Sequence, residues 1–385
     1  MTSKLAHIDL DFAERFVTDV FVALGTPRRE AAVCADVLIC SDRRGIDSHG
    51  LNRVKPIYFD RIKSGILNPA TRFEIVRETP ATAVVDGHNG MGHVVGKRCM
   101  QMAIDKAKKV GLGSVAVRNS THFGIAGYYV LMAADAGMIG IATTNARPSI
   151  APTFGAENML GTNPLTFGMP TDERFPFVLD CATSITQRGK IELYERLGKN
   201  VPAGWAIGDD GKARTNSRRI LKDLTTDHAA LTPLGGPGEE MAGYKGYGYA
   251  TVVEILSSAL QSGSFMKALT GMQDGHKIPI PIGHFFLAMD VEAFIDLAEF
   301  KKNTGDILRA LRASKKAPGQ KRIYTAGEKE YLVSIERKKT GIPLPPSVQI
   351  DLVTMRDELG LSQYRFAFEP RPRAKLQQRG KSKTV

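Results

Sequence analysis

The chain has 385 residues, 43% of them hydrophobic and 24% charged, and its formal net charge is +12. This length predicts about two or three domains, and the composition is that of a globular protein with enough apolar material for a large core. No apolar run reaches the ~18 residues of a membrane span, and the N-terminus lacks the apolar segment of a signal peptide. We therefore expect a cytoplasmic protein without a membrane partner.

The cysteines give no sign of a disulfide framework or of a zinc site. Cys34, Cys40, Cys99 and Cys181 contain no CxxC pair, so we expect reduced and mostly buried thiols. Two histidines in a glycine-rich loop lack a clustered third ligand. We expect no bound metal.

Positive charge gathers at the C-terminal end, in residues 371–385. Such an end is more often a solvated, poorly ordered tail than a binding site, and no aromatic stacking surface accompanies it. A nucleic-acid-associated protein that uses this tail stays open as an alternative of a different class. A positive field also suits a protein that collects anionic substrates and a dinucleotide.

The first ~70 residues are predicted to be mostly helical. Apolar residues recur at helical spacing over residues 9–24, 28–42 and 51–64. Pro56 removes a backbone donor within the third helix and is expected to perturb it.

From residue 73 onward, predicted strands alternate with helices. Strands are expected at residues 73–76, 82–86, 113–118, 139–144, 177–180 and 284–289. Helices are expected at residues 97–110, 126–137 and 247–261. This alternation argues for an α/β layer architecture, and we place that domain at residues 73–302.

The chain then returns to a helical, charged pattern. Helices are expected at residues 303–317, 327–340 and 347–360, with a break at the prolines of 342–346. Because chain termini often lie close together, we expect residues 1–72 and 303–370 to form one discontinuous helical domain. Residues 371–385 follow it as the tail.

Two glycine-rich segments look like a Rossmann dinucleotide fingerprint, but neither fits it. In residues 90–96 the third glycine comes one residue late, and no carboxylate ends the next strand. Residues 111–116 have the inverted context, because they end a helix, and Gly111 is better interpreted as the cap of that helix. If the protein binds NAD(P), it does so by another route.

Residues 45–53 place Ser48, His49 and Arg53 at a loop that opens a helix. Arg53 offers a planar fork that can grip a carboxylate, and His49 shares its helix face if the helix has already begun. A helix cap with an exposed arginine explains the same residues equally well.

His122 lies in residues 118–124, in a loop that leaves one strand and enters the next helix. Loops held by a rigid sheet often carry catalytic groups, and an unperturbed histidine exchanges protons near neutral pH. A lone loop histidine is more often structural, but the neighbouring polar and glycine residues favour a function here.

Residues 143–164 form a long segment without strong periodicity, rich in Gly, Pro, Asn and Thr. Irregular segments of this length inside a compact domain tend to be functional. The hydroxyl and amide groups of Thr144, Asn145 and Asn163 suit hydrogen bonds to a cofactor. Arg147 suits a phosphate or a substrate carboxylate.

Asp180 ends a predicted strand, where its side chain can orient a ring or a histidine. Thr183 is a hydroxyl donor that serves equally well as a helix cap. Lys245 precedes a predicted helix, and its ammonium together with the free N–H groups of the helix start makes a phosphate site. An exposed loop lysine is the competing interpretation.

Taken together, these segments resemble a malate/L-lactate dehydrogenase family that is distinct from the Rossmann lactate and malate dehydrogenases. Its other members are ureidoglycolate, sulfolactate and 2,3-diketogulonate enzymes and some cyclic imine reductases. The motifs cover most of residues 10–350 and are DSHGLNR, NSTHFG, ARPSIAPTFGAENMLGTNP, LDCATS, QRGK, VPAGWAIG, AGYKGYG, GHFF and GIPLP.

The resemblance implies a sulfolactate dehydrogenase-like fold, in which a non-Rossmann NAD(P)-binding mixed-sheet domain joins a helical domain built from both chain ends. It also implies a homodimer with the site near the subunit interface. The expected reaction moves a hydride between NAD(P) and C2 of a small 2-hydroxy acid, malate first and lactate second, with a slight preference for NAD over NADP. Reduction of a related 2-oxo acid, ureido acid or cyclic imine carboxylate is the alternative.

The resemblance also implies residue roles. His122 would be the acid/base, and Ser48, His49 and Arg53 would lie near the substrate carboxylate. The implied cofactor contacts are Asp180, Cys181, Ala182, Lys245, Gly327 and Glu328. The sequence departs from the family at Ala326, where a proline is usual, and in extra residues between 236 and 245.

Overall fold

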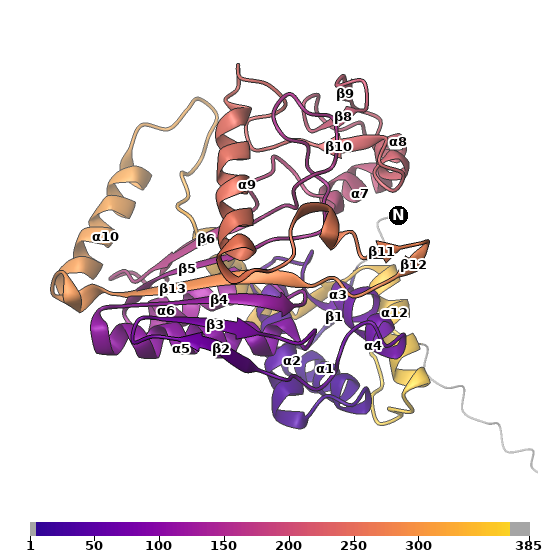
Figure 1. Cartoon of the computed structure of the whole chain (residues 1–385), viewed down its shortest axis with the longest axis horizontal. Coiled ribbons are helices and arrows are strands. Elements are labelled where there is room, and N and C mark those ends of the chain that lie inside the picture. The colour runs from indigo at the N-terminus through magenta and orange to yellow at the C-terminus, as the bar shows by residue number, and fades with distance from the viewer. Residues whose placement is uncertain (1–4, 370–385) are drawn as a thin grey trace, which may run out of the picture.

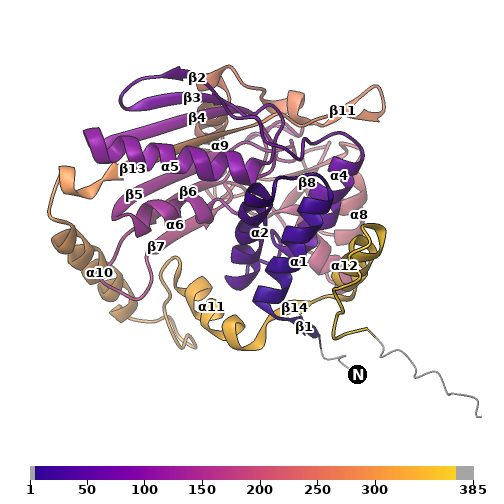
Figure 2. The ribbon, with the colours of Figure 1, turned by 90° about the horizontal axis from the view of Figure 1, so that it is seen from below.

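The computed structural model describes residues 5–369, and in it an early and a late segment of the chain lie side by side. Strand β1 (Ala6–Ile8) pairs antiparallel with β14 (Ile342–Leu344). Helices α1 (Leu10–Ala23), α2 (Arg28–Arg43) and α12 (Pro346–Glu358) pack around a shared apolar core beside this ribbon (Figure 2). The predicted tail, residues 371–385, lies outside the described residues.

The third N-terminal helix is continuous but irregular. It consists of α3 (Leu51–Arg53), a π-helical segment η1 (Val54–Phe59) and α4 (Asp60–Lys63). The π segment contains Pro56, so the predicted perturbation is confirmed. Within this segment the ring of Tyr58 is completely buried.

A mixed sheet of seven strands forms the centre of the molecule (Figure 1). Only β3 and β4 run parallel; the other neighbours are antiparallel. In spatial order the strands are β2 (Glu74–Glu78), β3 (Thr82–Asp86), β4 (Leu112–Ser120), β13 (Ile282–Asp290), β5 (Met138–Thr144), β6 (Leu165–Met169) and β7 (Phe177–Cys181). The expected α/β fold class is therefore confirmed.

Helices cover both faces of the sheet (Figure 1). Helices α5 (Gly92–Val110) and α6 (Gly127–Asp135) lie on one face, and α9 (Gly243–Ser257) lies on the other. Gly111 ends α5 in the left-handed conformation, as predicted. Packing requires glycine at position 92, because a Cβ there would lie 2.2 Å from the carbonyl oxygen of Thr121.

A small lobe between β7 and α9 was not expected from the sequence. It contains α7 (Arg188–Arg196), β8 (Ala206–Gly208), β9 (Ala213–Arg214), α8 (Ser217–Asp223) and β10 (Ala229–Leu231). Its apolar core includes Ile191, Ile220 and Leu231. The remaining short elements are η2 (Ala259–Gln261), η3 (Met266–Leu269), β11 (Met272–Gln273), β12 (His276–Lys277) and η4 (Val291–Ala293).

Helices α10 (Leu297–Ala313) and α11 (Glu328–Thr340) lead back to the helical cluster. Figure 2 shows α10 at the far end of the molecule from α1 and α12, with α11 between them. Arg309 of α10 pairs with Asp172 in the turn before β7. The predicted domain boundaries stay predictions. No helix among residues 5–369 is long and apolar enough to cross a membrane.

Candidate active site

His122 lies in the loop between β4 and α6, and two groups meet one nitrogen of its ring. The hydroxyl of Tyr58 contacts Nδ1, and the backbone N–H of Gly124 donates to the same atom at 3.3 Å. Because an amide can only donate, Nδ1 acts as an acceptor and the proton of the neutral ring sits on Nε2. Nε2 has no partner among the described residues and is not fully enclosed, so it faces accessible space.

A second imidazole stacks on the first. The ring of His49 lies parallel to that of His122, with centroids 5.7 Å apart and planes inclined by 15°. The Ser48 hydroxyl bonds to Nδ1 of His49 at 2.8 Å, and Nε of Arg53 donates to the Ser48 carbonyl oxygen at 2.6 Å. The structure therefore brings residues near 50 and near 120 together.

A buried carboxylate holds the loop that carries these groups. The carboxylate of Asp42, on α2, accepts the backbone N–H of Leu51 at 2.7 Å. A Cβ at Gly50 would lie 2.1 Å from that carboxylate, so only glycine fits there. Arg337 of α11 pairs with Asp47 and donates to the carbonyl oxygen of Asp42, which ties the loop to a distant helix.

The surroundings keep both imidazoles neutral. Burial, followed by the charges of His49, His93, Arg53 and Arg61, holds the pKa of His122 well below its usual range. Burial and then Arg53 lower the pKa of His49 to about 4. Both rings are therefore unprotonated at physiological pH, and the unprotonated ring is the form that can act as a general base.

Sequence reasoning missed two members of this cluster. Tyr58 has the apolar helical spacing of a core residue, which gave no sign of its contact with His122. His93 was considered in the sequence only as a possible metal ligand. In the structure it is completely buried, and neither ring nitrogen has a hydrogen-bond partner among the described residues. The centroid of its ring lies 4.7 Å from that of the Tyr58 ring. No group of side chains among residues 5–369 could hold a metal ion.

Among the described residues, no hydrogen bond connects Asp180 to His122. Its carboxylate accepts the backbone N–H of Gly127 at 2.7 Å and the hydroxyl of Thr166 at 3.2 Å, and burial raises its pKa. It thereby fixes the start of α6, the helix that follows the His122 loop. An orienting role for Asp180 through that loop stays a prediction.

Asp180 also lines a cavity of about 270 Å³ between β7 and the start of α11. Gly127 and Gly327 line it too, together with the cationic Arg44 and Lys329. Cys181 and Ala182 follow Asp180 at the end of β7 and are half-buried. Two of the predicted cofactor residues, Asp180 and Gly327, thus line one cavity.

Other predicted cofactor residues bond to the protein itself. Glu254 of α9 accepts the side-chain amides of Asn145 at 3.5 Å and Asn163 at 2.7 Å. The Thr144 hydroxyl bonds to His284 Nδ1, and the Thr183 hydroxyl donates to the Asn163 carbonyl oxygen. These contacts hold the two ends of the irregular segment between β5 and β6 in place. Contacts of these residues with a cofactor stay predictions.

The remaining predicted residues are spread more widely. Arg147 is exposed in the irregular segment, and Lys245 is exposed in the first turn of α9. Glu328 is buried at the start of α11, where it pairs with Arg322 and accepts the backbone N–H of Thr325 at 3.1 Å. Its carboxylate caps that turn.

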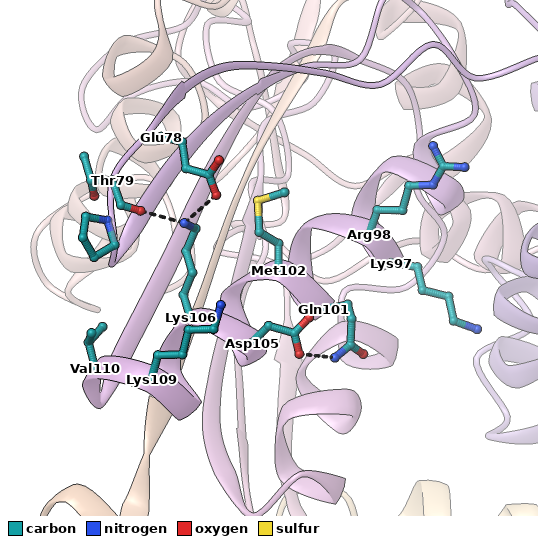
Figure 3. A pocket seen from close by; sticks show the side chains of 11 residues that line it. Glu78, Thr79, Lys97, Arg98, Gln101, Met102, Asp105, Lys106, Lys109 and Val110 are labelled. Atoms are coloured by element: carbon teal, nitrogen blue, oxygen red, sulfur yellow. Dashed lines mark hydrogen bonds and ion pairs between the residues drawn. The ribbon is translucent and has the colours of Figure 1, made fainter.

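A wider cavity of about 900 Å³ lies elsewhere, between the β2–β3 hairpin and α5 (Figure 3). It lacks His122 and every other predicted site residue. Lys106 there bonds to the Glu78 carboxylate at 2.8 Å and the Thr79 carbonyl oxygen at 2.7 Å. Lys97 and Arg98 have carboxylate partners on α2. Such internally paired cations leave little charge for a ligand.

Comparisons with known proteins cover nearly the whole chain. A sequence profile described as malate/L-lactate dehydrogenase matches residues 8–353. The chain is 44% identical over 346 residues to a malate dehydrogenase of Pyrococcus abyssi, which spans 90% of this chain and 93% of that protein. It is 37% identical to an L-sulfolactate dehydrogenase of Methanocaldococcus jannaschii, over 91% of this chain and 96% of that one. The crystal structure of malate dehydrogenase from Entamoeba histolytica superimposes with a TM-score of 0.90 at 46% identity, over 93% and 99% of the two chains.

Proposed function

The chain belongs to the malate/L-lactate dehydrogenase family and is a 2-hydroxy acid dehydrogenase, and we propose that it oxidises malate with NAD(P) at the His122 site. The observation that carries this proposal is the pair of stacked imidazoles beside Arg53, a guanidinium with no carboxylate partner among the described residues. A neutral base next to an unpaired guanidinium suits a substrate that brings both a hydroxyl and a carboxylate.

The residues present fit a nicotinamide dinucleotide. The cavity at Asp180, Gly127 and Gly327 is at the small end of ligand pockets, with room for one ring system of the cofactor. Arg44 and Lys329 line it, and Lys245 at the start of α9 has no ion-pair partner among the described residues. These cations match the anionic pyrophosphate. The buried Oδ1 of Asn163 also has no partner among the described residues and is free to accept a hydrogen bond.

The cofactor-binding set that we propose follows from these positions. It consists of Thr144, Asn145, Asn163, Asp180, Cys181, Ala182, Thr183, Lys245, Gly327 and Glu328. The braced members of the set would act through their backbone or through the shape they impose, since their side chains already bond within the protein. NAD is our first choice, and NADP is the alternative.

When bound, the nicotinamide ring supplies the hydride acceptor for C2 of the substrate. His122 removes the proton of the C2 hydroxyl through its accessible nitrogen in the oxidation and returns it in the reduction. Arg53, with Ser48 and His49, holds the C1 carboxylate so that C2 lies beside His122. Orientation of this kind contributes on the order of 7–11 kcal/mol, and proton transfer contributes a further ~10²–10⁴-fold.

We also propose that the protein is a homodimer. Several apolar side chains on the outer side of α9 are exposed, among them Tyr249 at 54%, Val252 at 46% and Ile255 at 53%. Their spacing puts them close together on one helix face, and exposed apolar patches of this kind mark association sites. Light scattering of the purified protein, before and after Val252→Glu, tests the dimer.

A spectrophotometric screen at 340 nm tests the function. Malate, lactate, sulfolactate and ureidoglycolate are each assayed with NAD and with NADP. We expect the highest kcat/KM with malate. Absence of nicotinamide-dependent oxidation of every one of these acids would refute the proposal, and a preference for ureidoglycolate would move it to the ureido acid alternative.

A further inference from the structure

Arg337, near the end of α11, is a mostly buried arginine whose side chain bonds to the chain on either side of residues 44–46. We call residues 44–53, which carry the proposed substrate-binding side chains, the 44–53 segment. The side chain of Arg337 is 12% exposed. Its guanidinium pairs with both carboxylate oxygens of Asp47, one of them at 2.9 Å, and Nη1 also donates to the carbonyl oxygen of Asp42. A planar fork bound in this way fixes direction as well as distance.

Asp42 carries this anchor on to the helix that bears Arg53. It lies in the last turn of α2, and its carbonyl oxygen accepts the backbone N–H of Gly45 at 2.9 Å besides the guanidinium of Arg337. Its carboxylate accepts the N–H of Leu51, the first residue of α3, at 2.7 Å. One residue therefore holds both the start of the 44–53 segment and the beginning of its helix.

The 44–53 segment also rests directly on α11. Gly45 has φ +80°, and a Cβ there would lie 2.9 Å from Cγ1 of Val333. Val333 precedes Arg337 by four residues, so the two side chains lie on the same face of α11. The helix is fixed at its start, where the buried Glu328 accepts the backbone N–H of Thr325 at 3.1 Å. An anchored helix thus supports the segment through packing and through an ion pair.

We infer that Arg337 is a positioning residue for the substrate, because it holds the 44–53 segment so that Arg53 and His49 face the C1 carboxylate. The inference rests on the proposed function, and it deepens that function by naming a residue on another helix on which the grip of the carboxylate depends. The Ser48 hydroxyl bonds to His49, and Arg53 donates to the Ser48 carbonyl oxygen. A shift of the segment therefore moves all three side chains together, and binding geometry is sensitive to displacements of about 1 Å.

An ion pair that only stabilises the fold is the competing explanation for Arg337. The Asp47 side chain is 48% exposed, and exposed ion pairs contribute little to stability. Arg356 of α12 provides the comparison within the chain. Its side chain is 14% exposed, it pairs with the carboxylate of Glu369, and it donates to the carbonyl oxygen of Tyr364 at 3.4 Å. Arg356 therefore has the same kinds of partner as Arg337, but neither partner belongs to the 44–53 segment.

The first test compares wild type with Arg337→Met, Arg337→Lys and the matched control Arg356→Met, each assayed with malate and with lactate at saturating cofactor. Arg337→Met is expected to raise KM for both acids about tenfold and to keep kcat within about threefold, because His122 lies on a different loop. Arg337→Lys keeps the charge without the fork and is expected to show a smaller rise. Arg356→Met is expected to lose thermal stability as Arg337→Met does, with KM within about twofold of wild type.

A double variant tests whether Arg337 acts through Arg53. Two changes that disturb one interaction do not add, whereas independent changes do. We expect Arg337→Met combined with Arg53→Lys to show a KM close to that of the more affected single variant. Effects that multiply in the double variant would overturn the inference. So would a KM in Arg337→Met that is unchanged while only thermal stability falls.

Amide hydrogen exchange, measured by mass spectrometry, gives a readout that needs no activity. Exchange in the 44–53 segment is expected to be faster in Arg337→Met than in wild type and in Arg356→Met. Unchanged exchange there would overturn the inference. If wild type oxidises no 2-hydroxy acid, the proposed function fails, and the exchange result alone then decides whether Arg337 positions this segment. Should Arg337→Met not fold, Arg337→Lys carries each comparison.

Discussion

Tyr58 and His122 are 64 residues apart in the chain, yet the tyrosine hydroxyl contacts Nδ1 of the imidazole. The contact joins the helical cluster to the loop that leaves the central sheet. It fixes the tautomer of His122 and turns Nε2 toward accessible space. Burial raises the pKa of Tyr58 well above its usual range, so its hydroxyl stays protonated and able to donate.

Replacing Tyr58 by phenylalanine should therefore affect chemistry more than binding. Loss of one hydrogen bond, about 1 kcal/mol, is expected to lower kcat roughly fivefold with little change in KM for malate. The pH dependence of kcat should shift as well, because His122 loses its donor at Nδ1. Tyr128→Phe is the control, since its hydroxyl bonds to Asp36 on α2. An unchanged kcat and pH profile for Tyr58→Phe would argue against the positioning role.

The substitution Arg53→Lys tests the grip on the C1 carboxylate. Lysine keeps the charge but loses the planar fork that binds a carboxylate through two parallel bonds. We expect KM to rise about tenfold for malate and lactate alike, because both substrates carry a C1 carboxylate. Arg218→Lys, at a residue whose side chain is 87% exposed, is the control. Unaltered kinetics on every carboxylate substrate would rule out this role for Arg53.

The buried histidines make the fold sensitive to acid. His93 is completely buried and burial lowers its pKa to about 3, whereas an unfolded histidine titrates near 6.5. Between these two values the unfolded chain binds the extra proton, so stability falls as pH falls. Each such histidine lowers the free energy of unfolding by about 1.4 kcal/mol for every pH unit of acidification between the two pKa values.

His93→Leu is expected to flatten the dependence of the unfolding free energy on pH between about 6 and 4, as measured by urea titrations. The control is His276→Leu, which removes an exposed imidazole and leaves the core unchanged. A slope that is the same in wild type and His93→Leu would show that His93 is not a source of the acid sensitivity.

Local patterns in the sequence predicted the long helices outside the lobe between β7 and α9 and most strands of the central sheet. The spacing of apolar residues predicted α1 and α2, and Pro56 predicted the irregular helix that carries Tyr58. The order of the strands was out of reach, because β13 inserts between β4 and β5 from far along the chain. The lobe around α7 and β8 was missed because its elements are short and lack a clear period.

In the candidate site, too, some residues could be predicted from local sequence patterns and others only from the tertiary structure. His122, His49 and Arg53 were proposed because they stand out in glycine-rich loops, and the structure brings the two imidazoles together. Tyr58 lies on a helix where its apolar spacing looks like that of an ordinary core residue. Only its contact with His122, from a distant part of the chain, reveals its place in the site, and no local pattern contains that information.

The central claim is that His122 moves the proton of the substrate hydroxyl. The most direct measurement is the steady-state rate of malate oxidation by His122→Asn at saturating cofactor, with folding verified by thermal unfolding. Loss of the acid/base group predicts a fall in kcat of about 10²–10⁴-fold, with the protein still able to bind malate through Arg53. A kcat that stays within twofold of wild type would contradict the account.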